Sequence, residues 1–251
     1  MNATGCTSHV NGADHYLSRQ LILTRDDCPF GSEIRINLDG RQVLPPHASC
    51  TLPAHQMSGI YSEILMQTRL IAFSLKDRNT ATGKEYFSRR FVCVAQSDLV
   101  DSALTEELIQ SGDALRAFGQ TLVVALSELP LSAASFQDKK KILHNVYLLK
   151  DHGVEIALDH YIPQDESVEM FTSLNLFDYI KIPVSDLDSS LKLNGNPDLF
   201  NQLYERMTML SHNTKVSFIA DRVEHSASHV LARALPFNYF QGSYYSPADN
   251  L

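Results

Sequence analysis

The second half of the chain alternates between short apolar runs and amphipathic stretches, and this alternation restricts the fold more than any other feature. The run "VEIAL" at 154–158 has the length of a buried strand, and it follows a stretch in which Ile142, Val146 and Leu149 recur at helical spacing. Further strand and helix patterns follow at intervals of roughly 25–40 residues. Such alternation is typical of parallel strands joined by helical crossovers.

The same alternation can be followed along most of the chain. Towards the C-terminus it predicts strands at 178–182, 215–220 and 238–242 and helices at 165–175, 197–213 and 226–235. In the middle it predicts strands at 89–95 and 121–126 and helices at 58–76, 101–112 and within 139–153. Near the N-terminus, 20–25 and 32–38 are predicted to pair as an antiparallel hairpin. Seven or eight strands, most of them followed by a helix, favour a closed or nearly closed (β/α) barrel over an open sheet.

The size and composition suit one such domain, which we predict over 19–251 after an N-terminal tail at 1–18. A chain of 251 residues with 44% hydrophobic residues is long enough to bury a core. No secretory signal and no membrane span is predicted, and the four cysteines are widely spaced, so we expect reduced thiols and a cytoplasmic protein. A net charge of -8 argues against nucleic acid or an anionic membrane as a partner.

Polar residues at the ends of the predicted strands are the candidates for a functional site. In (β/α) barrels the chemistry lies at the C-terminal ends of the strands. The residues at or after these ends are Glu128, Asp159, Lys181, Asp221 and Gln241.

Four segments of the second half carry a resemblance to a known family. The segments "GVEIALDHY", "FDYIKIPVSDL", "KVSFIADRVEHSASHVLARAL" and "FNYFQGSYYSP" resemble the EAL family in their order and spacing. The resemblance is clear over 140–248 and weaker over 20–135. Active members of that family hydrolyse the second messenger cyclic di-GMP. The resemblance implies an α/β fold, a modified TIM (β/α)8-like barrel of the EAL type with one antiparallel strand.

The family's chemistry needs two divalent cations, held by carboxylates and an asparagine, and a carboxylate base that activates water. Two metals about 3.5–4 Å apart clamp the attacking and leaving oxygens of a phosphodiester. Glu33 of "GSEIRIN" matches the name-giving glutamate, with Ile34 and Arg35 in place of its alanine and leucine. The arginine that follows this motif falls on Asn37, and the metal-binding asparagine falls near Cys93.

Several further positions depart from the family pattern. The motif glutamate of the next strand falls on Ala125, while the loop glutamate is kept as Glu128. The double aspartate becomes Asp159-His160, and the loop after it, "YIPQDES", has no glycine.

Towards the C-terminus, matches and departures are mixed. Lys181, Glu224 and Gln241 match the family, but the aspartate two residues after the lysine is replaced by Pro183. The proposed base glutamate falls on Asp221, and the glycine that follows it falls on Arg222. The shorter aspartate would misplace a base that must lie within about 3 Å of its water.

These departures together predict a protein that is not an enzyme. Loss of several carboxylates removes both metal ligands and the attraction for divalent cations. We therefore assign no catalytic residue, no metal ligand and no cofactor; magnesium or manganese would be needed only if the protein were active after all. The resemblance implies a vestigial pocket made of Glu33, Glu128, Asp159, His160, Lys181, Asp221, Arg222, Glu224 and Gln241.

Each of these residues has a structural interpretation beside the functional one. Asp159 is either a surviving ligand or a cap of the next turn. His160 either binds zinc with Cys93 and Glu33 or is a hydrogen-bonded histidine beside a filled pocket, and we favour the second. For Lys181 we favour an internal ion pair, with Asp159 or with Asp221, over a contact with phosphate.

Three further residues of this pocket, near the C-terminus, also have structural interpretations. Gln241 either reads a guanine edge or caps a turn, and Glu224 is expected to be structural. Arg222 places a cation at the barrel mouth, where it could fill the vacant metal space and neutralise the carboxylates.

Three functions follow from the resemblance. The first is an inactive EAL-like regulatory protein that binds another protein, such as a transcription factor, in the control of motility or biofilm genes. The second is a receptor that binds cyclic di-GMP without turnover. The third is a residual metal-dependent phosphodiesterase. EAL barrels often dimerise through the region near this altered loop, and the loss of the loop's glycines leaves a homodimer open here.

Overall fold

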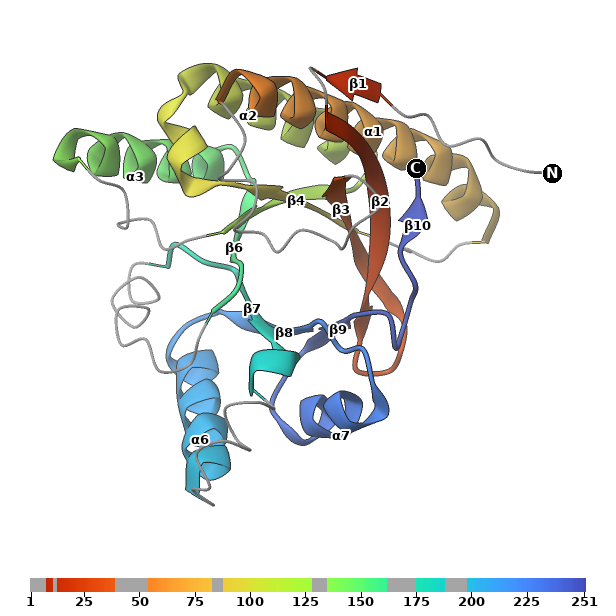
Figure 1. Cartoon of the computed structure of the whole chain (residues 1–251), viewed down its shortest axis with the longest axis vertical. Helices are drawn as coiled ribbons and strands as arrows, with labels where there is room; N and C mark the ends of the chain where they lie inside the picture. Colours follow the sequence, from red (N-terminus) through yellow and green to blue (C-terminus); the bar gives the residue numbers. More distant parts are fainter. Residues whose placement is uncertain are drawn as a thin grey trace.

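The computed structural model places eight strands around a closed barrel (Figure 1). The structure describes residues 8–10, 13–38, 54–82, 88–127, 135–161, 175–187 and 198–251. Seven strands pair in parallel with their neighbours in chain order. They are β3 (Pro29–Leu38), β4 (Arg89–Val94), β5 (Thr121–Leu126), β6 (Glu155–Leu158), β7 (Tyr179–Pro183), β8 (Ser217–Asp221) and β9 (Tyr239–Gln241).

The eighth strand, β2 (Ala13–Thr24), closes the barrel and runs against both of its neighbours. It pairs with β3 along its length and with β9 at its end, where Ile22 lies opposite Gln241. Two short strands outside the barrel, β1 (Ser8–Val10) and β10 (Asp249–Asn250), also pair with β2. The predicted barrel with one antiparallel strand is confirmed.

The N-terminal region differs from the tail that was predicted over 1–18. Residues 8–10 form β1, and β2 begins at Ala13. The first half of β2, "ADHYLSR", has too few apolar residues to be recognised as a strand from its hydrophobic pattern. Its extended backbone is fixed by the long register with β3, which starts at the pair His15 and Leu38.

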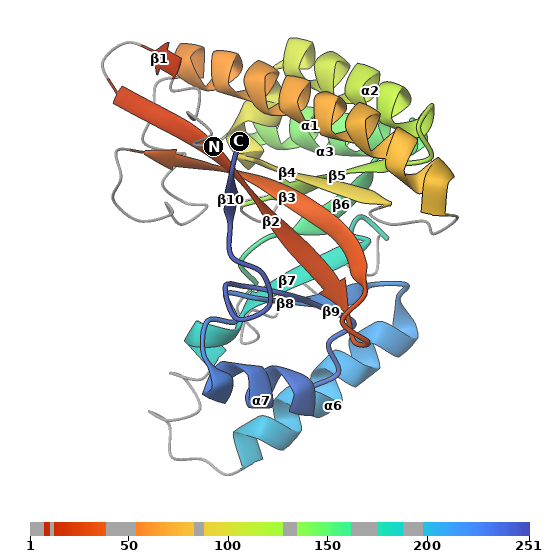
Figure 2. The same ribbon diagram turned by 90° about the vertical axis from the view of Figure 1, so that its right-hand side faces the viewer.

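The helices lie on two sides of the barrel (Figures 1 and 2). One group consists of α1 (Ala54–Thr82), α2 (Ser102–Arg116) and α3 (Phe136–Asp151), and the other of α6 (Asp198–Asn213) and α7 (Ser226–Ala234). A short 3-10 helix, Gln96–Val100, precedes α2. The starts of two helices are capped, because Asp101 accepts from the backbone of Ala103 and Ser135 from that of Asp138.

The strand period of two separates the apolar residues into two layers. Side chains that point outward pack under the helices in the main core, as Val92 on β4 and Val124 on β5 do. Those that point inward form a second cluster that fills the barrel, and they include Phe91, Val123 and Ala125. The polar residues at the strand ends continue the inward set, and this parity brings them together.

Two sequence predictions fall outside the described residues. They are Glu128 and most of the predicted helix at 165–175. Within the described part of the chain, no helix is both long and apolar enough to span a bilayer.

Candidate functional site

Five of the residues predicted for the site meet at the C-terminal mouth of the barrel. Each comes from a different strand or strand end, and each is buried. They are Glu33 on β3, Asp159 after β6, Lys181 on β7, Asp221 on β8 and Gln241 on β9.

Glu33 is the centre of this group. Its Oε1 accepts a hydrogen bond of 2.6 Å from the ammonium of Lys181. Its Oε2 accepts one of 2.8 Å from Nε2 of Gln241 and one of 2.5 Å from Nε of Arg35. Since the side chains of Lys181 and Glu33 are 0% and 1% exposed, this is a fully desolvated ion pair.

Arg35 is the residue that sequence reasoning did not assign to the site. Its guanidinium bridges two carboxylates, because Nη2 also donates to Oδ1 of Asp221 at 2.9 Å. Although burial opposes it, the carboxylates of Asp221, Glu33 and Asp159 raise the pKa of Arg35 well above its ordinary value. The strand period carried the signal, since Glu33 and Arg35 stand two apart and must face the same side.

Lys181 is engaged in internal ion pairs, but its closest partner is Glu33, which was not one of the two predicted partners. Of those two, Asp159 lies near it, with 3.6 Å between Nζ and Oδ1. Although burial opposes it, Asp159, Asp221 and Glu33 raise the pKa of this lysine above its ordinary value. The ammonium therefore stays charged at neutral pH.

The pKa values of the three carboxylates of the mouth are shifted in different directions. Burial raises the pKa of Asp221, but Arg35, Lys181 and Arg222 outweigh it and hold this pKa well below its ordinary range. Arg35 and Lys181 likewise outweigh burial at Glu33 and lower its pKa. Burial dominates at Asp159, so its pKa is raised in spite of Lys181.

The positions of the cations explain this difference. Arg35 lies against both Glu33 and Asp221, whereas the nearest cation to Asp159 is Lys181, at 3.6 Å. The thiol of Cys93, which lies 3.8 Å from Oδ2 of Asp159, is protonated at neutral pH, because burial and the neighbouring carboxylates raise its pKa.

The cation expected to fill the mouth was Arg222, and the structure places Arg35 there instead. Arg222 stands at the rim, where its Nε is 4.0 Å from Oδ2 of Asp221. Its side chain is 24% exposed. Arg35, which is 18% exposed, makes the shorter contacts, with Glu33 on its own strand and with Asp221 across the barrel.

Two residues at the mouth have left-handed backbone conformations. His160 has φ 58° and Arg222 has φ 54°. This region disfavours side chains with a Cβ, which gives a physical reason for the glycine that the resemblance places at position 222. The imidazole of His160 has turned to Asp186, with 3.5 Å between Nε2 and Oδ2.

The mouth does not fit a pair of divalent cations as the family holds them. Oxygens of Glu33, Asp159 and Asp221 that could bind a metal are engaged by Arg35 and Lys181. Over the described ranges, no group of three or more His, Cys, Asp or Glu is arranged to hold a metal ion. His160, Cys93 and Glu33, the residues of the zinc alternative, do not form such a group either.

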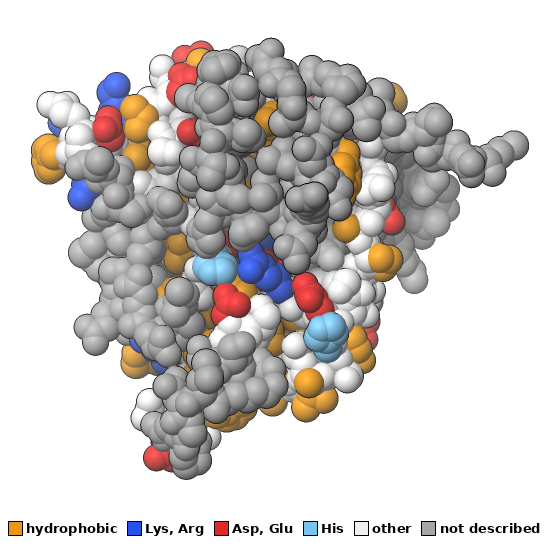
Figure 3. All heavy atoms as spheres, in the orientation of Figure 1, with side chains coloured by type: hydrophobic (Ala, Val, Ile, Leu, Met, Phe, Trp, Pro, Cys, Tyr) orange, Lys and Arg blue, Asp and Glu red, His pale blue; other side chains and the backbone are white. Residues whose placement is uncertain are grey.

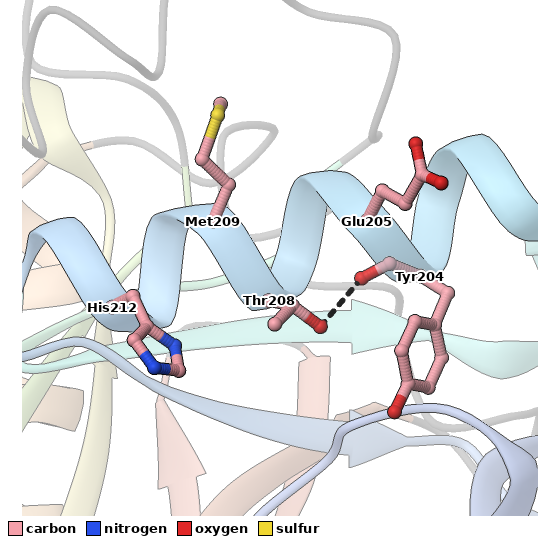
Figure 4. Close-up of a pocket in the computed structure, with 5 residues that line it drawn as sticks. All are labelled: Tyr204, Glu205, Thr208, Met209 and His212. Carbon is pink, nitrogen blue, oxygen red and sulfur yellow. Dashed lines mark hydrogen bonds between the residues drawn. The ribbon is translucent and has the colours of Figure 1, made fainter.

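The face that carries the mouth has charged side chains at its centre. Figure 3 shows basic, acidic and histidine side chains close together where the barrel opens in Figure 1. Glu224 is exposed and follows β8. Away from the barrel mouth, a shallow pocket lies on the outer face of α6 (Figure 4). It is lined by Tyr204, Glu205, Thr208, Met209 and His212 and contains none of the predicted site residues.

Comparison with known proteins identifies the fold. One similar structure is that of the EAL enzyme Bd1971 with cAMP and cyclic di-GMP bound, with a TM-score of 0.71 and 14% identity. Another is the EAL domain of FimX from Xanthomonas citri in complex with cyclic di-GMP, with a TM-score of 0.61 and 12% identity. A third is YkuI from Bacillus subtilis in complex with cyclic di-GMP and calcium, with a TM-score of 0.69 and 15% identity.

The coverage of these matches is uneven. Each covers 94% of this chain, but only 62% of Bd1971, 88% of the FimX domain and 55% of YkuI. No curated protein matches the sequence. The model of the EAL domain family matches residues 32–248, which is most of the chain. The chain therefore belongs to the EAL domain family.

Proposed function

We propose that this protein is an EAL domain without phosphodiesterase activity, which acts in cyclic di-GMP signalling by binding a regulatory protein. The regulatory partner would be of the kind that controls motility or biofilm genes, such as a transcription factor. The observation that carries the proposal is the position of Arg35, whose guanidinium bridges Glu33 and Asp221 in the barrel mouth.

The ion pairs of the mouth are the first support. A divalent cation needs carboxylate oxygens that are free to coordinate it. Here Glu33 and Asp221 are engaged by Arg35, and Lys181 occupies the space between Glu33 and Asp159. A metal would have to displace Arg35 and Lys181 from these carboxylates, and each displaced cation would lose its ion-pair partners.

The state of Asp221 is the second support. A general base works best when its pKa lies near the operating pH. The pKa of Asp221 is held well below its ordinary range by Arg35, Lys181 and Arg222, which outweigh burial. Its carboxylate is therefore a weak base, and its Oδ1 already accepts from Arg35.

A receptor for cyclic di-GMP is the second candidate function. It is favoured by the similar structures of the Bd1971 enzyme and the FimX domain, both of which hold this nucleotide. Glu33, Lys181 and Gln241 are present, but they are hydrogen-bonded to one another. A nucleotide would have to compete with these contacts.

Calorimetric titration of the purified protein with cyclic di-GMP separates these functions. It is run with EDTA, with magnesium and with manganese, and hydrolysis is followed in the same samples by chromatography. A catalytically active EAL domain serves as the positive control. We expect neither heat nor turnover.

Binding without turnover would establish the receptor function instead. Turnover that depends on the metal, and that is lost in an Asp221→Asn variant, would overturn the proposal. The Asp221→Asn control ties any activity to this barrel mouth, because a contaminating enzyme would be unaffected by it.

A further inference from the structure

Helix α1 carries an apolar stripe on its outer face. Met66, Leu70 and Phe73 are 46%, 55% and 61% exposed. Their spacing places them on one side of the helix, one above the other. The opposite side of α1 is buried against the core through residues such as Ile64 and Ala72. Grouped apolar side chains on a surface are typical of an interaction site.

Helix α2 lies beside this stripe. The hydroxyl of Ser62 on α1 donates to Oε2 of Glu107 on α2 at 3.1 Å. Further along, the rings of Phe73 and Phe118 meet edge to face with their centroids 6.0 Å apart. Phe118 lies just beyond the end of α2, and the two contacts are eleven residues apart in both segments, so α1 and α2 run side by side in the same direction (Figure 2).

Helix α2 carries more acidic than basic side chains. Over Ser102–Arg116, the three acids Glu106, Glu107 and Asp113 stand against one cation, Arg116. The described side chains of α1 add one charge of each sign, Glu63 and Arg69. Arg116 pairs with Asp113 at 3.1 Å, but both side chains are more than half exposed. An exposed pair of this kind contributes little and can exchange partners. The described side chains of α1 and α2 therefore keep an excess of acidic groups, in a chain whose net charge is -8.

We infer that this region is the docking surface for a basic amphipathic helix of a partner protein. The α1 surface is defined as Met66, Leu70 and Phe73 with the acidic residues Glu106, Glu107 and Asp113. An amphipathic helix lays apolar residues at i, i+4 and i+7 onto such a stripe. Lysine or arginine on the flank of the partner helix would face the acidic residues of α2. Charge complementarity of this kind favours a basic partner over an acidic one.

A second copy of this chain fits the α1 surface less well. Antiparallel packing of two α1 helices would bring the two acidic faces of α2 against each other. Like charges across an interface oppose association. The inference rests on the proposed function, because it assigns the surface by which the regulatory protein binds its partner.

Fluorescence anisotropy with synthetic helical peptides tests the inference. The probe is a labelled leucine-lysine peptide with leucines at i, i+4 and i+7, and the control peptide has glutamate in place of lysine. Binding is measured in EDTA and without nucleotide for the full chain and for Leu70→Asp, Leu70→Gln and Val230→Asp. Val230 is 65% exposed on α7 and is the matched control. Circular dichroism checks that each variant is folded.

We expect the lysine peptide to bind and the glutamate peptide not to bind. Both Leu70 variants should weaken binding by about tenfold or more, since buried anchors dominate such interfaces. Val230→Asp should change it less than about twofold. Leu70→Asp is informative because its added negative charge would strengthen a purely electrostatic contact.

Equal binding to wild type and both Leu70 variants would overturn the inference, as would equal binding of both peptides. A wild-type dimer in light scattering that Leu70→Asp dissociates would also overturn it, in favour of self-association. The peptide-binding test and the test of the proposed function can fail independently of each other. Turnover of cyclic di-GMP with intact peptide binding would overturn only the proposed function, and loss of peptide binding without turnover would overturn only the docking surface.

Discussion

The two ends of the barrel are both closed by charged side chains, but in different ways. At the N-terminal end, Arg89 pairs with Glu155 at 3.2 Å, and the hydroxyl of Tyr179 donates to the same carboxylate. Aromatic rings fill the space around them, with Phe30 stacked on Tyr239 at 3.7 Å and Arg89 over the Phe30 ring. One cation meets one carboxylate, and both are partly exposed.

At the C-terminal mouth the described carboxylates outnumber the buried cations, and none of the aromatic rings just named takes part. Glu33, Asp159 and Asp221 are held by Arg35 and Lys181. The first end is built as a structural plug. In the mouth, cations of the protein itself hold a cluster of buried carboxylates. The difference shows that several buried carboxylates need cations placed directly against them, whereas a single partly exposed pair is covered by aromatic rings.

Replacement of Lys181 by methionine should have the largest effect of those considered. It would leave Glu33 and Asp159 buried without their ammonium, and breaking a buried ion pair costs about 3–5 kcal/mol. Urea denaturation measures the free energy of unfolding. The matched variant at the other end, Arg89→Met, should cost only about 1–2 kcal/mol, because its pair is partly exposed.

Equal losses at the two ends would contradict the comparison. A second substitution sharpens it. In the Lys181→Met background, Glu33→Gln should restore part of the stability, since it removes a buried charge that has lost its partner.

Replacement of Arg35 by leucine should have the next largest effect, and manganese should offset much of the loss of stability. In EDTA the variant should lose about 2–4 kcal/mol, because Glu33 and Asp221 lose the guanidinium between them. Manganese at millimolar concentration should raise its melting temperature, since a ligand at about 100 times its dissociation constant stabilises by about 2.7 kcal/mol. Differential scanning fluorimetry with and without manganese measures both effects. A wild type that responds to manganese as strongly as the variant would show that Arg35 does not exclude metal.

Acid should destabilise the protein through the mouth. The pKa values of Glu33 and Asp221 are lowered in the folded state, chiefly by Arg35 and Lys181 against the opposing effect of burial. Their contribution is therefore present above the ordinary carboxyl pKa and is lost as the pH falls towards the lowered values. The raised pKa of Asp159 acts in the opposite direction, but it is one group against two.

We expect a loss of about 2 kcal/mol between pH 5 and pH 2, measured by urea denaturation at each pH. In the Asp221→Asn variant, the free energy of unfolding should fall less steeply between pH 5 and pH 2; this part of the pH profile is called the acid limb. Asp249→Asn is the control, because its pair with Arg19 is exposed and should contribute little. An unchanged acid limb in Asp221→Asn would place the acid sensitivity elsewhere in the molecule.

Replacement of Arg222 by glycine should have the smallest effect. Its ion pair is long, and the left-handed conformation costs a non-glycine residue about 1–2 kcal/mol, which glycine avoids at an entropic cost of about 0.5–1 kcal/mol. The free energy of unfolding should stay within about 1 kcal/mol of wild type. The variant should also gain no response to manganese in the scanning assay. A response like that of Arg35→Leu would show that Arg222 is the cation that excludes metal.

Much of the fold could be read from the pattern of apolar residues. The strands β4 and β5 were predicted nearly to their bounds, because buried parallel strands are continuous apolar runs. The hairpin of β2 and β3 was predicted as a pair, but shorter than it is, since β2 begins at Ala13 and β3 at Pro29. The polar start of β2 gave no such signal. Its conformation depends on the backbone of β3, which lies opposite it.

The sequence by itself determined the residue types of the site and the strands that carry them, since polar residues at strand ends mark the barrel mouth. It also determined that Glu33 and Arg35 face the same side, through the period of two. Which cation fills the mouth was decided only by the tertiary structure. Arg35 and Asp221 are brought together by the closing of the barrel, and the preference of a carboxylate for one cation over another depends on distance and burial. Neither quantity exists until distant strands have packed.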